Sequence, residues 1–401
     1  MLTFELSEEQ LDIQKMARDF AEREIRPSAE RLDRSQQLLQ DFPWALVRKG
    51  SEIGFRTVAL PREYGGPEFD FRTWVVLIDE LGYPDIACAK IFSQNWKLCR
   101  AIAHRGTQEQ KDRFLPAFRD DDTFLLADAG AEPEAGSDDH FPYDEPHGGV
   151  MLSARRVGDH YVLNGRKRFI SLGPVAKLLL VSARTDRSVG PVEGTSTFLV
   201  PGDTPGFTLA SVHDKVGFRV YLHGELSFDN AEVPVENLLR RKEGDSYSEV
   251  FYGASNIELS AHAMALARAA LDAATKYASE RVQGGKRIIE HQAVELALAD
   301  MYITLQAGRS LLWRAAWAMD NNRMDRALTM ACKVFCTEAA INICRNAVEL
   351  FGGSGVMREL PMQKYFRDSL VLSHMDGTNQ INRIKIGAIV ESRFSEGRLS
   401  R

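Results

Sequence analysis

The chain has 401 residues, of which 44% are hydrophobic and 26% charged, a composition that excludes a disordered or collagen-like protein. This length exceeds what one hydrophobic core fills, so we expect two or three subdomains. The formal net charge of -6 and the pI near 5.9 argue against nucleic-acid binding, which would need a strongly basic domain or stripe.

The five cysteines and the first residues of the chain both predict a cytoplasmic protein. The cysteines are odd in number, form no CxxC pair and lie in apolar stretches, which is typical of buried thiols in a reducing compartment. The N-terminal segment is acidic from Glu5 onward and has neither the basic nor the apolar region of a secretory signal. No apolar run reaches the roughly 18 to 20 residues of a membrane span, so we expect no membrane partner.

Residues 1–122 are predicted to form an N-terminal helical domain. Ser7 and Gln10 have the spacing of a capping box and should begin the first helix. Further helices are expected over 71–81 and 109–118. Residues 60–66 contain Pro and paired Gly, and they predict a loop.

Residues 123–240 change to a period of two and predict a small antiparallel β domain. Apolar, β-branched runs over 176–185 and 196–200 indicate strands. The segment 161–171 predicts a hairpin that turns at Asn164-Gly165, because Asn-Gly favours a type I′ turn. Residues 138–147 are polar, contain Pro, and predict a loop.

Residues 241–401 return to a helical period. Long Ala- and Leu-rich segments over 257–281, 291–321 and 324–350 predict helices, and the segment after Gly377 predicts another. Together they indicate a C-terminal four-helix bundle. The fold class is therefore α+β, mainly α.

Chemistry is most strongly indicated in three segments, although each has a plain structural alternative. Residues 131–138 combine small residues with Ser137, which can donate to a phosphate or carbonyl, or they form a simple connector. The Gly-rich residues 351–355 allow close backbone approach, or they are a helix C-cap. Asp376 stands beside Gly377 in a tight turn, where apolar neighbours could raise its pKa toward that of a useful base, or it is an N-cap.

These segments, in this order, resemble the acyl-CoA dehydrogenase family. The resemblance also includes Arg168-Phe169-Ile170-Ser171 and the stretch 280–292, and it spans essentially the whole chain. It implies the same three-domain order that the periodicity predicts. It also implies that FAD lies between the β domain and the bundle and reaches a neighbouring subunit, so a homodimer or homotetramer is expected.

The resemblance carries a set of cofactor contacts onto this chain. The wall around the flavin and ribityl chain would be formed by Asp128, Ala129, Ala131, Gly136, Ser137, Phe169, Ile170 and Ser171, with Thr378 and Gln380 as further FAD contacts. The rest of the dinucleotide would be held from the second subunit by Arg281, Gln283, His291, Gln292, Glu349, Gly352 and Gly353.

The implied reaction is α,β-dehydrogenation of an acyl-CoA thioester. A carboxylate, here Asp376, removes the α-proton while flavin N5 accepts the β-hydrogen as hydride. The substrate would contact Ser137, Met375, Asp376 and Gly377, and the Asp376 N–H would bond the thioester oxygen. Reduced flavin would pass its electrons to an electron-transferring flavoprotein.

The catalytic position departs from the family pattern. Asp376 stands where glutamate is usual, and Met375 replaces the usual aromatic neighbour. Some members use instead a glutamate on the first bundle helix, but the matching residues here are Ser255 and Asn256, and Glu258 is out of register. We therefore expect Asp376 to be the base.

The cofactor contacts also depart from the family pattern. Ala131, Phe169, Gly284 and Glu349 replace the usual Thr, Trp, Phe and Gln. Because FAD is held mostly by backbone contacts, we expect its binding to persist.

The short base, Met375 and a long 139–147 loop suggest an acyl group that is cyclic or branched. One alternative is a flavin monooxygenase or non-oxidative enzyme on the same fold, against which the retained carboxylate argues. A second is a cofactor-free paralogue that only binds other molecules, which the altered FAD contacts make conceivable.

Overall fold

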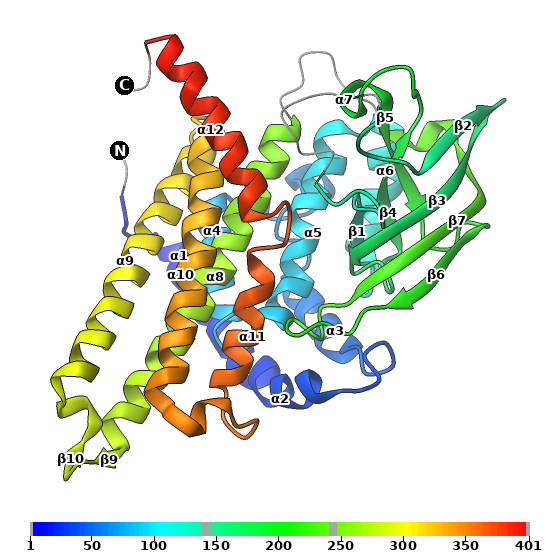
Figure 1. The fold of residues 1–401 in the computed structure, drawn as a ribbon. Helices are drawn as coiled ribbons and strands as arrows, with labels where there is room; N and C mark the ends of the chain where they lie inside the picture. Colours follow the sequence, from blue (N-terminus) through cyan, green and yellow to red (C-terminus); the bar gives the residue numbers. More distant parts are fainter. Residues whose placement is uncertain (1–2, 138–144, 146, 240–246, 398–401) are drawn as a thin grey trace.

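The fold places a helical layer between a helix bundle and a curled β-sheet (Figure 1). The computed structural model describes residues 3–137, 145, 147–239 and 247–397. The N-terminal helices pack against the bundle on one side, and α5 lies between the bundle and the sheet. The predicted three-part order of helices, strands and helices is confirmed.

The N-terminal helices begin where the sequence predicts. Ser7 accepts from the backbone N–H of Gln10 at 3.2 Å, and the Gln10 side chain accepts from Ser7, so the capping box is confirmed. The predicted helix over 71–81 is also present. The elements are α1 (Glu8–Phe20), a π-helical turn (Ala21–Ile25), α2 (Arg26–Arg34), α3 (Trp44–Ile53), α4 (Phe71–Leu81), α5 (Ile86–Arg105) and α6 (Gln108–Asp120).

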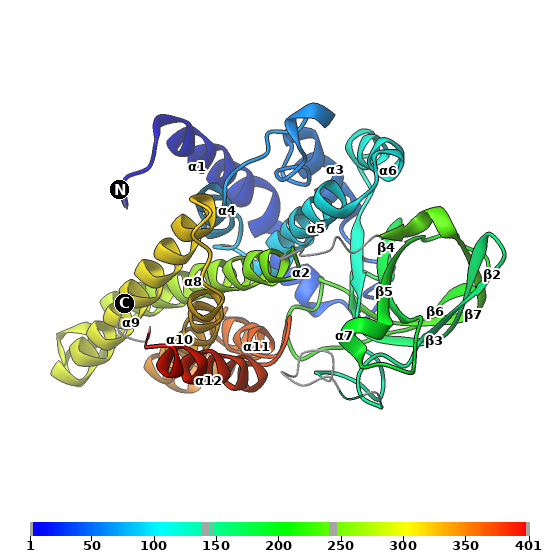
Figure 2. The ribbon, with the colours of Figure 1, turned by 90° about the horizontal axis from the view of Figure 1, so that it is seen from above.

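The middle domain is one sheet that curls round its own apolar core (Figure 2). Its order is β6-β7-β3-β2-β4-β5-β8, with β1 paired beside β4. Most neighbours are antiparallel as predicted, but β4 pairs in parallel with both β1 and β2. The strands are β1 (Leu126–Ala129), β2 (Ser153–Val157), β3 (His160–Ser171), β4 (Leu178–Arg184), β5 (Thr195–Pro201), β6 (Phe207–Val212), β7 (His223–Pro234) and β8 (Leu238–Leu239), with the short α7 (Pro191–Gly194) before β5.

The predicted turn at Asn164-Gly165 is wrong, because both residues lie inside the continuous strand β3. They form an irregularity in its register with β7, where the Asn164 side chain accepts from the backbone N–H of Asn230 at 2.9 Å. The hairpin turn falls instead at Gly158-Asp159, since Val157 pairs with His160. Asn-Gly is thus used for a bulge, which also favours glycine.

The C-terminal helices form the predicted bundle from α8 (Tyr247–Glu280), α9 (Gln292–Asp320), α10 (Arg326–Phe351) and α12 (Asn379–Ser395), with α11 (Met362–Leu372) packed against it. Two two-residue strands, β9 (Val282–Gln283) and β10 (Lys286–Arg287), pair between α8 and α9. By length and composition alone, residues 326–356 could cross a membrane. However, 67% of their most apolar window is buried inside the fold, where α10 packs along α8 and α9.

Helix α5 lies in the core but carries several polar and charged side chains. Nearly all of it is buried, yet its buried face includes Lys90, Ser93, Gln94 and Lys97. The five cysteines are buried free thiols, as the sequence predicted. Burying lysines requires compensating charges, and these come from α8 and from the segment before α12.

Candidate active site

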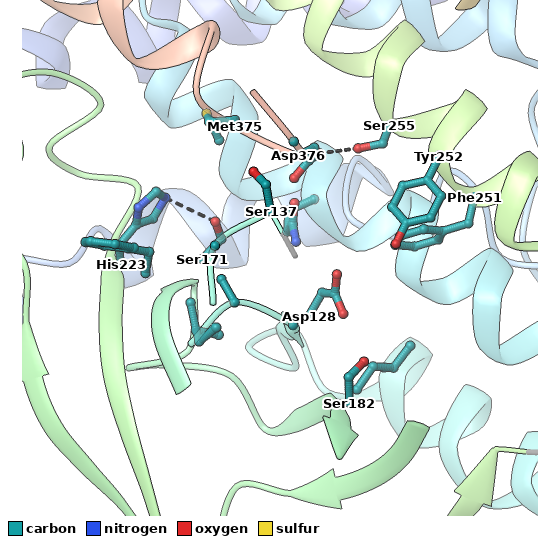
Figure 3. Close-up of a pocket in the computed structure, with 18 of the residues that line it drawn as sticks. Asp128, Ser137, Ser171, Ser182, His223, Phe251, Tyr252, Ser255, Met375 and Asp376 are labelled. Carbon is teal, nitrogen blue, oxygen red and sulfur yellow. Dashed lines mark hydrogen bonds between the residues drawn. The ribbon is translucent and has the colours of Figure 1, made fainter. Parts of the chain in front are cut away.

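A cavity of about 550 Å³ opens between the curled sheet and the helices (Figure 3). This size is within the usual range for ligand pockets, about 300–1,000 Å³. The cavity brings together most of the flavin-wall and substrate residues predicted from the sequence, namely Asp128, Ala131, Gly136, Ser137, Phe169, Ile170, Ser171, Met375, Asp376, Gly377 and Thr378. Ala129 is buried behind it, and Gln380 is exposed outside its lining.

The segment between α11 and α12 presents Asp376 to the cavity through a strained turn. Asp376 has a φ of 49° and Gly377 a φ of 81°, so two consecutive residues are left-handed. Such a conformation is costly for a residue other than glycine, and it is often found at functional sites. Lys333 fixes the turn by donating to the Gly377 carbonyl at 2.6 Å, and Thr378 caps α12 by accepting from the Ile381 N–H at 3.2 Å.

The carboxylate of Asp376 is held from behind by two side chains. Lys97 Nζ on α5 lies 2.5 Å from Asp376 Oδ2. The Ser255 hydroxyl on α8 donates to the same oxygen (Figure 3). Lys97 also donates to Ser255 at 3.0 Å. The Asp376 side chain remains 28% exposed. One face of the carboxylate is therefore bound to protein while the other meets the cavity.

These contacts reverse the expected direction of the Asp376 pKa. Burial alone would raise the pKa, as the apolar neighbours suggested. The positive charges of Lys97 and Lys90, with hydrogen bonds from Lys97 and Ser255, outweigh burial and hold the pKa well below its usual value. The prediction of a raised pKa is wrong because it considered only residues close in sequence.

Glu258 does not line the cavity but belongs to a buried charge network behind Asp376. Its Oε1 lies 2.6 Å from Lys90 Nζ and its Oε2 lies 3.5 Å from Lys97 Nζ. Ser93 donates to Glu258 and also contacts His262 Nε2 at 2.9 Å. A glutamate whose oxygens face lysines away from the cavity is unsuited to act as the base.

The opposite wall of the cavity is built on the loop that follows β1. Glu132 accepts from the backbone N–H groups of Met151 and Leu152 at 2.7 and 2.9 Å. Lys167, which is fully buried, bonds both Glu132 and the Gly130 carbonyl at 2.8 Å. A buried ion pair thus fixes the loop so that its small residues face the cavity.

This wall has the features that a flavin requires. A Cβ added at Gly130 or Gly136 would meet nothing within 4 Å, so the backbone there is open to a ligand. Phe169 has a φ of 59° and leaves half of its ring exposed at the cavity. Ser171 bonds His223 at 3.0 Å (Figure 3). Exposed backbone, an aromatic face and hydroxyls can hold a polar, planar ring system.

The residues predicted to contact FAD from a second subunit lie elsewhere, around the end of α8. The hairpin β9–β10 extends from the tip of the bundle (Figure 1), and His291 contacts the Gln283 carbonyl at 3.0 Å. Tyr277 stacks on Phe351 with ring centroids 4.0 Å apart, which places the Gly-rich segment beside the α8 terminus. His291 is half-buried, whereas Arg281, Gln283, Gln292, Glu349, Gly352 and Gly353 are exposed.

Several cavity residues were not anticipated from the sequence, notably Gln94, Arg105, Ser182, Lys215, Phe251 and Tyr252. Burial lowers the pKa of Lys215 to about 7, and its ammonium donates to the Tyr221 carbonyl at 2.8 Å. A signal for the network behind Asp376 was nevertheless present. Polar residues recur at helical spacing within the apolar helix α5, which indicates a polar face inside the core.

The structure thus combines an N-terminal helical domain, a curled β-sheet and a helix bundle around one cavity, in which the Asp376 carboxylate lies together with the predicted flavin-wall residues. Family models for the N-terminal, middle and C-terminal domains of acyl-CoA dehydrogenase match residues 7–121, 127–231 and 253–390. The chain belongs to the acyl-CoA dehydrogenase family, and its cofactor is FAD.

Known proteins of this family are similar to this chain over almost its entire length. A probable acyl-CoA dehydrogenase of Bacillus subtilis is 33% identical over 391 residues, which cover 96% of this chain and 98% of that one. The cyclohex-1-ene-1-carbonyl-CoA dehydrogenase of Geobacter metallireducens is 35% identical over 386 residues, covering 95% and 98%. The structure of butyryl-CoA dehydrogenase from Megasphaera elsdenii has a TM-score of 0.88 at 29% identity, covering 97% and 99%.

Proposed function

We propose that the protein dehydrogenates a cyclic or branched acyl-CoA thioester, with Asp376 as the base. One observation carries the proposal. The carboxylate of Asp376 is pinned through Oδ2 and faces, from the other side, the cavity that contains the flavin wall. An anchored carboxylate in a cavity is suited to remove a proton from a bound substrate.

The chain's own residues account for proton removal and for orientation of the thioester. When the Cα–H bond breaks, the proton passes to the Asp376 carboxylate. The Asp376 N–H has no acceptor among the described residues, so it is available to bond the thioester oxygen and stabilise the charge that develops there. The residues around Gly136 and Phe169 would hold FAD, which would supply the acceptor for the hydride from Cβ.

The short side chain of Asp376 and its neighbour Met375 both support a cyclic or branched acyl group. Aspartate reaches one methylene less far than glutamate, so the α-carbon must come closer to the turn at Gly377. Met375 is buried and lines the same cavity, where a flexible thioether adapts to an irregular surface. The relative from Geobacter metallireducens, named for a cyclic acyl-CoA, supports this class. The loop over 139–147, which also motivated it, lies largely outside the described residues.

The test is the visible absorption spectrum of the purified holoenzyme, recorded without oxygen before and after adding cyclic, branched and straight-chain acyl-CoA thioesters. We expect the flavin band to bleach fastest with a cyclic or branched thioester. Fastest bleaching by a straight-chain thioester would reject the proposed acyl class but leave the dehydrogenase activity standing.

Asparagine substitutions identify the base. Asp376→Asn should retain bound flavin and lose substrate-driven bleaching, because an amide cannot accept the α-proton. Asp128→Asn is the matched comparison, since Asp128 is a second carboxylate in the cavity (Figure 3). Bleaching that survives Asp376→Asn but not Asp128→Asn would move the base to Asp128.

A homodimer or a homotetramer is proposed from the separation of the two predicted FAD-contact groups. Large apolar side chains are exposed near the second group and along the bundle, including Val282, Leu296, Tyr302, Ile303, Val356, Met357 and Phe394. Exposed apolar area on this scale suits a protein interface. Light scattering on the holoenzyme should give a dimer or tetramer mass, and a monomer that retains FAD would contradict the shared site.

An electron-transferring flavoprotein is the proposed electron acceptor, and the cytoplasm the proposed location. The buried thiols support a reducing compartment. Turnover under air should stay slow until the flavoprotein is added. Fast turnover with oxygen alone would favour the monooxygenase alternative, and a colourless protein that refuses FAD would favour the cofactor-free one.

A further inference from the structure

The contacts of Asp376 distinguish its two carboxylate oxygens. Lys97 Nζ, at 2.5 Å, and the Ser255 hydroxyl both bond Oδ2. Oδ1 has no hydrogen-bond partner among the residues that the structure describes, although the side chain is 28% exposed. The two oxygens therefore have different roles available, one as an anchor and one as a proton acceptor.

Lys97 is itself fixed firmly enough to act as an anchor. Its side chain is 2% exposed, so its ammonium cannot turn to water. It donates to Ser255 at 3.0 Å and lies 3.5 Å from Glu258, which Lys90 holds at 2.6 Å. The ammonium group is thus located by neighbours on both α5 and α8.

The short side chain of Asp376 makes its position sensitive to the contact with Lys97. The backbone of Asp376 is fixed by the left-handed turn, and only two side-chain torsions separate it from the carboxylate. An error in the position of a catalytic group of about 1 Å can slow a reaction by roughly a hundredfold. A short side chain on a fixed backbone cannot compensate for such an error unless its carboxylate is held.

We propose that Lys97 is a positioning residue, which holds Oδ2 of Asp376 so that Oδ1 alone faces the substrate and accepts the α-proton. The inference rests on the proposed role of Asp376 as base. It assigns a function to a lysine that does not line the cavity. Ser255 assists by bonding the same oxygen, so the anchor joins α5, α8 and the turn before α12.

The same anchor keeps the base ionised in mild acid, and this effect gives the test its readout. Besides Lys97, the charged and titratable groups around Asp376 are Lys90 on α5, Glu258 on α8, Lys333 on α10, Asp128 on β1, Tyr221 just before β7 and His223 at its start. Arg105, Lys215 and His374 line the same cavity, and Arg326 and Lys385 line a neighbouring one that Asp376 also lines. Replacing Lys97 removes a charge and a hydrogen bond that lower the pKa of Asp376, while burial, which raises it, remains, so we expect the pKa to rise. Protonation would then silence the base at mildly acidic pH.

The experiment measures the second-order rate constant of anaerobic flavin reduction between about pH 5 and pH 8, because its pH dependence reports the free enzyme. Wild type should change by less than about threefold across this range. Lys97→Met should lose at least about tenfold at the acid end relative to its own rate at the alkaline end. Lys97→Arg, which keeps the charge, should restore the wild-type profile.

Two further variants keep the test decisive. Ser255→Ala removes the second hydrogen bond to Oδ2. It should shift the acid side of the pH–rate profile in the same direction as Lys97→Met, but by a smaller amount, and it replaces Lys97→Met as the test if that variant does not fold. Lys364→Met removes another buried lysine, one that contacts Asp85 and Asp368 at 2.7 and 2.5 Å outside the cavity. It should lower stability without moving the acid side of the pH–rate profile.

Infrared spectroscopy separates this inference from the proposed function. A protonated-carboxyl band that is absent in Asp376→Asn should develop at higher pH in Lys97→Met than in wild type, whether or not Asp376 is the base. A Lys97→Met profile parallel to that of wild type, with an unmoved band, would overturn the positioning role. Retained flavin reduction in Asp376→Asn would instead overturn the proposed base.

Discussion

The buried pair between Lys90 and Glu258 gives a stability prediction that depends on which charge each substitution leaves behind. Both side chains are 0% exposed, with Nζ 2.6 Å from Oε1. Lys97 lies 3.5 Å from the other Glu258 oxygen. Lys90→Met therefore leaves Glu258 with a second partner. Glu258→Met removes the ion-pair partner that Lys90 has among the described residues, and so it should be the more damaging change.

Breaking a buried ion pair from one side costs about 3–5 kcal/mol, and we expect Glu258→Met to fall in this range and Lys90→Met below it. Unfolding entropy is about 2.1 cal/mol/K per residue, so over 401 residues this cost lowers Tm by about 4 to 6 °C. Thermal unfolding at saturating FAD and one fixed protein concentration measures the change.

The double variant Lys90→Met/Glu258→Met is the decisive control. It removes the orphaned cation and fills its place with an apolar side chain of similar length, so it should be more stable than Glu258→Met alone. If adding Lys90→Met to Glu258→Met lowers Tm further, the argument from uncompensated charge is refuted, and loss of packing explains the single variants instead.

Burial lowers the pKa of His262 from 6.5 to about 3, so the unfolded chain takes up a proton that the folded one refuses, and stability falls as pH drops through this window. His262→Asn should flatten the pH dependence of unfolding there by at most about 1.4 kcal/mol per pH unit, and an unchanged slope would contradict neutral burial. Arg281→Met should raise the dissociation constant of FAD in the assembled enzyme and leave the Tm of the apoprotein unchanged. Titration of the apoprotein with FAD measures the affinity, and an unchanged affinity would show that Arg281 is not part of the FAD site. Gly217→Ala should lower Tm because its Cβ would meet the Arg367 carbonyl oxygen, whereas a neutral result would show that this contact between the middle domain and α11 yields readily.

The parts of the fold that depend on local pattern could be predicted from the sequence. The capping box of Ser7 and Gln10 and the long bundle helices follow from residues within one or two turns of each other. Asn164-Gly165 shows the limit of local reasoning. The same dipeptide suits a type I′ turn and a bulge, and its pairing with Asn230 on a distant strand decides between them.

The electrostatics of the site could not be predicted from residues near Asp376 in sequence. Apolar neighbours suggested a raised pKa, but Lys97 is 279 positions away and reverses the direction. The helical spacing of Lys90, Ser93 and Lys97 indicates a polar face within an apolar helix, a signal that was not used in predicting the site. It did not reveal what that face meets, because helix packing decides which residues of α8 lie opposite.

Departures from the family pattern that are scattered along the sequence are neighbours in the structure. Asp376 replaces a glutamate, and Ser255 stands where some members place their base; the two side chains bond each other and share Lys97. A longer carboxylate at position 376 would have to displace the Ser255 hydroxyl or turn its Oε atoms away from the ammonium. If Asp376 is the base, as proposed, the shorter side chain and its two anchors form one arrangement, in which fixed orientation offsets the shorter reach.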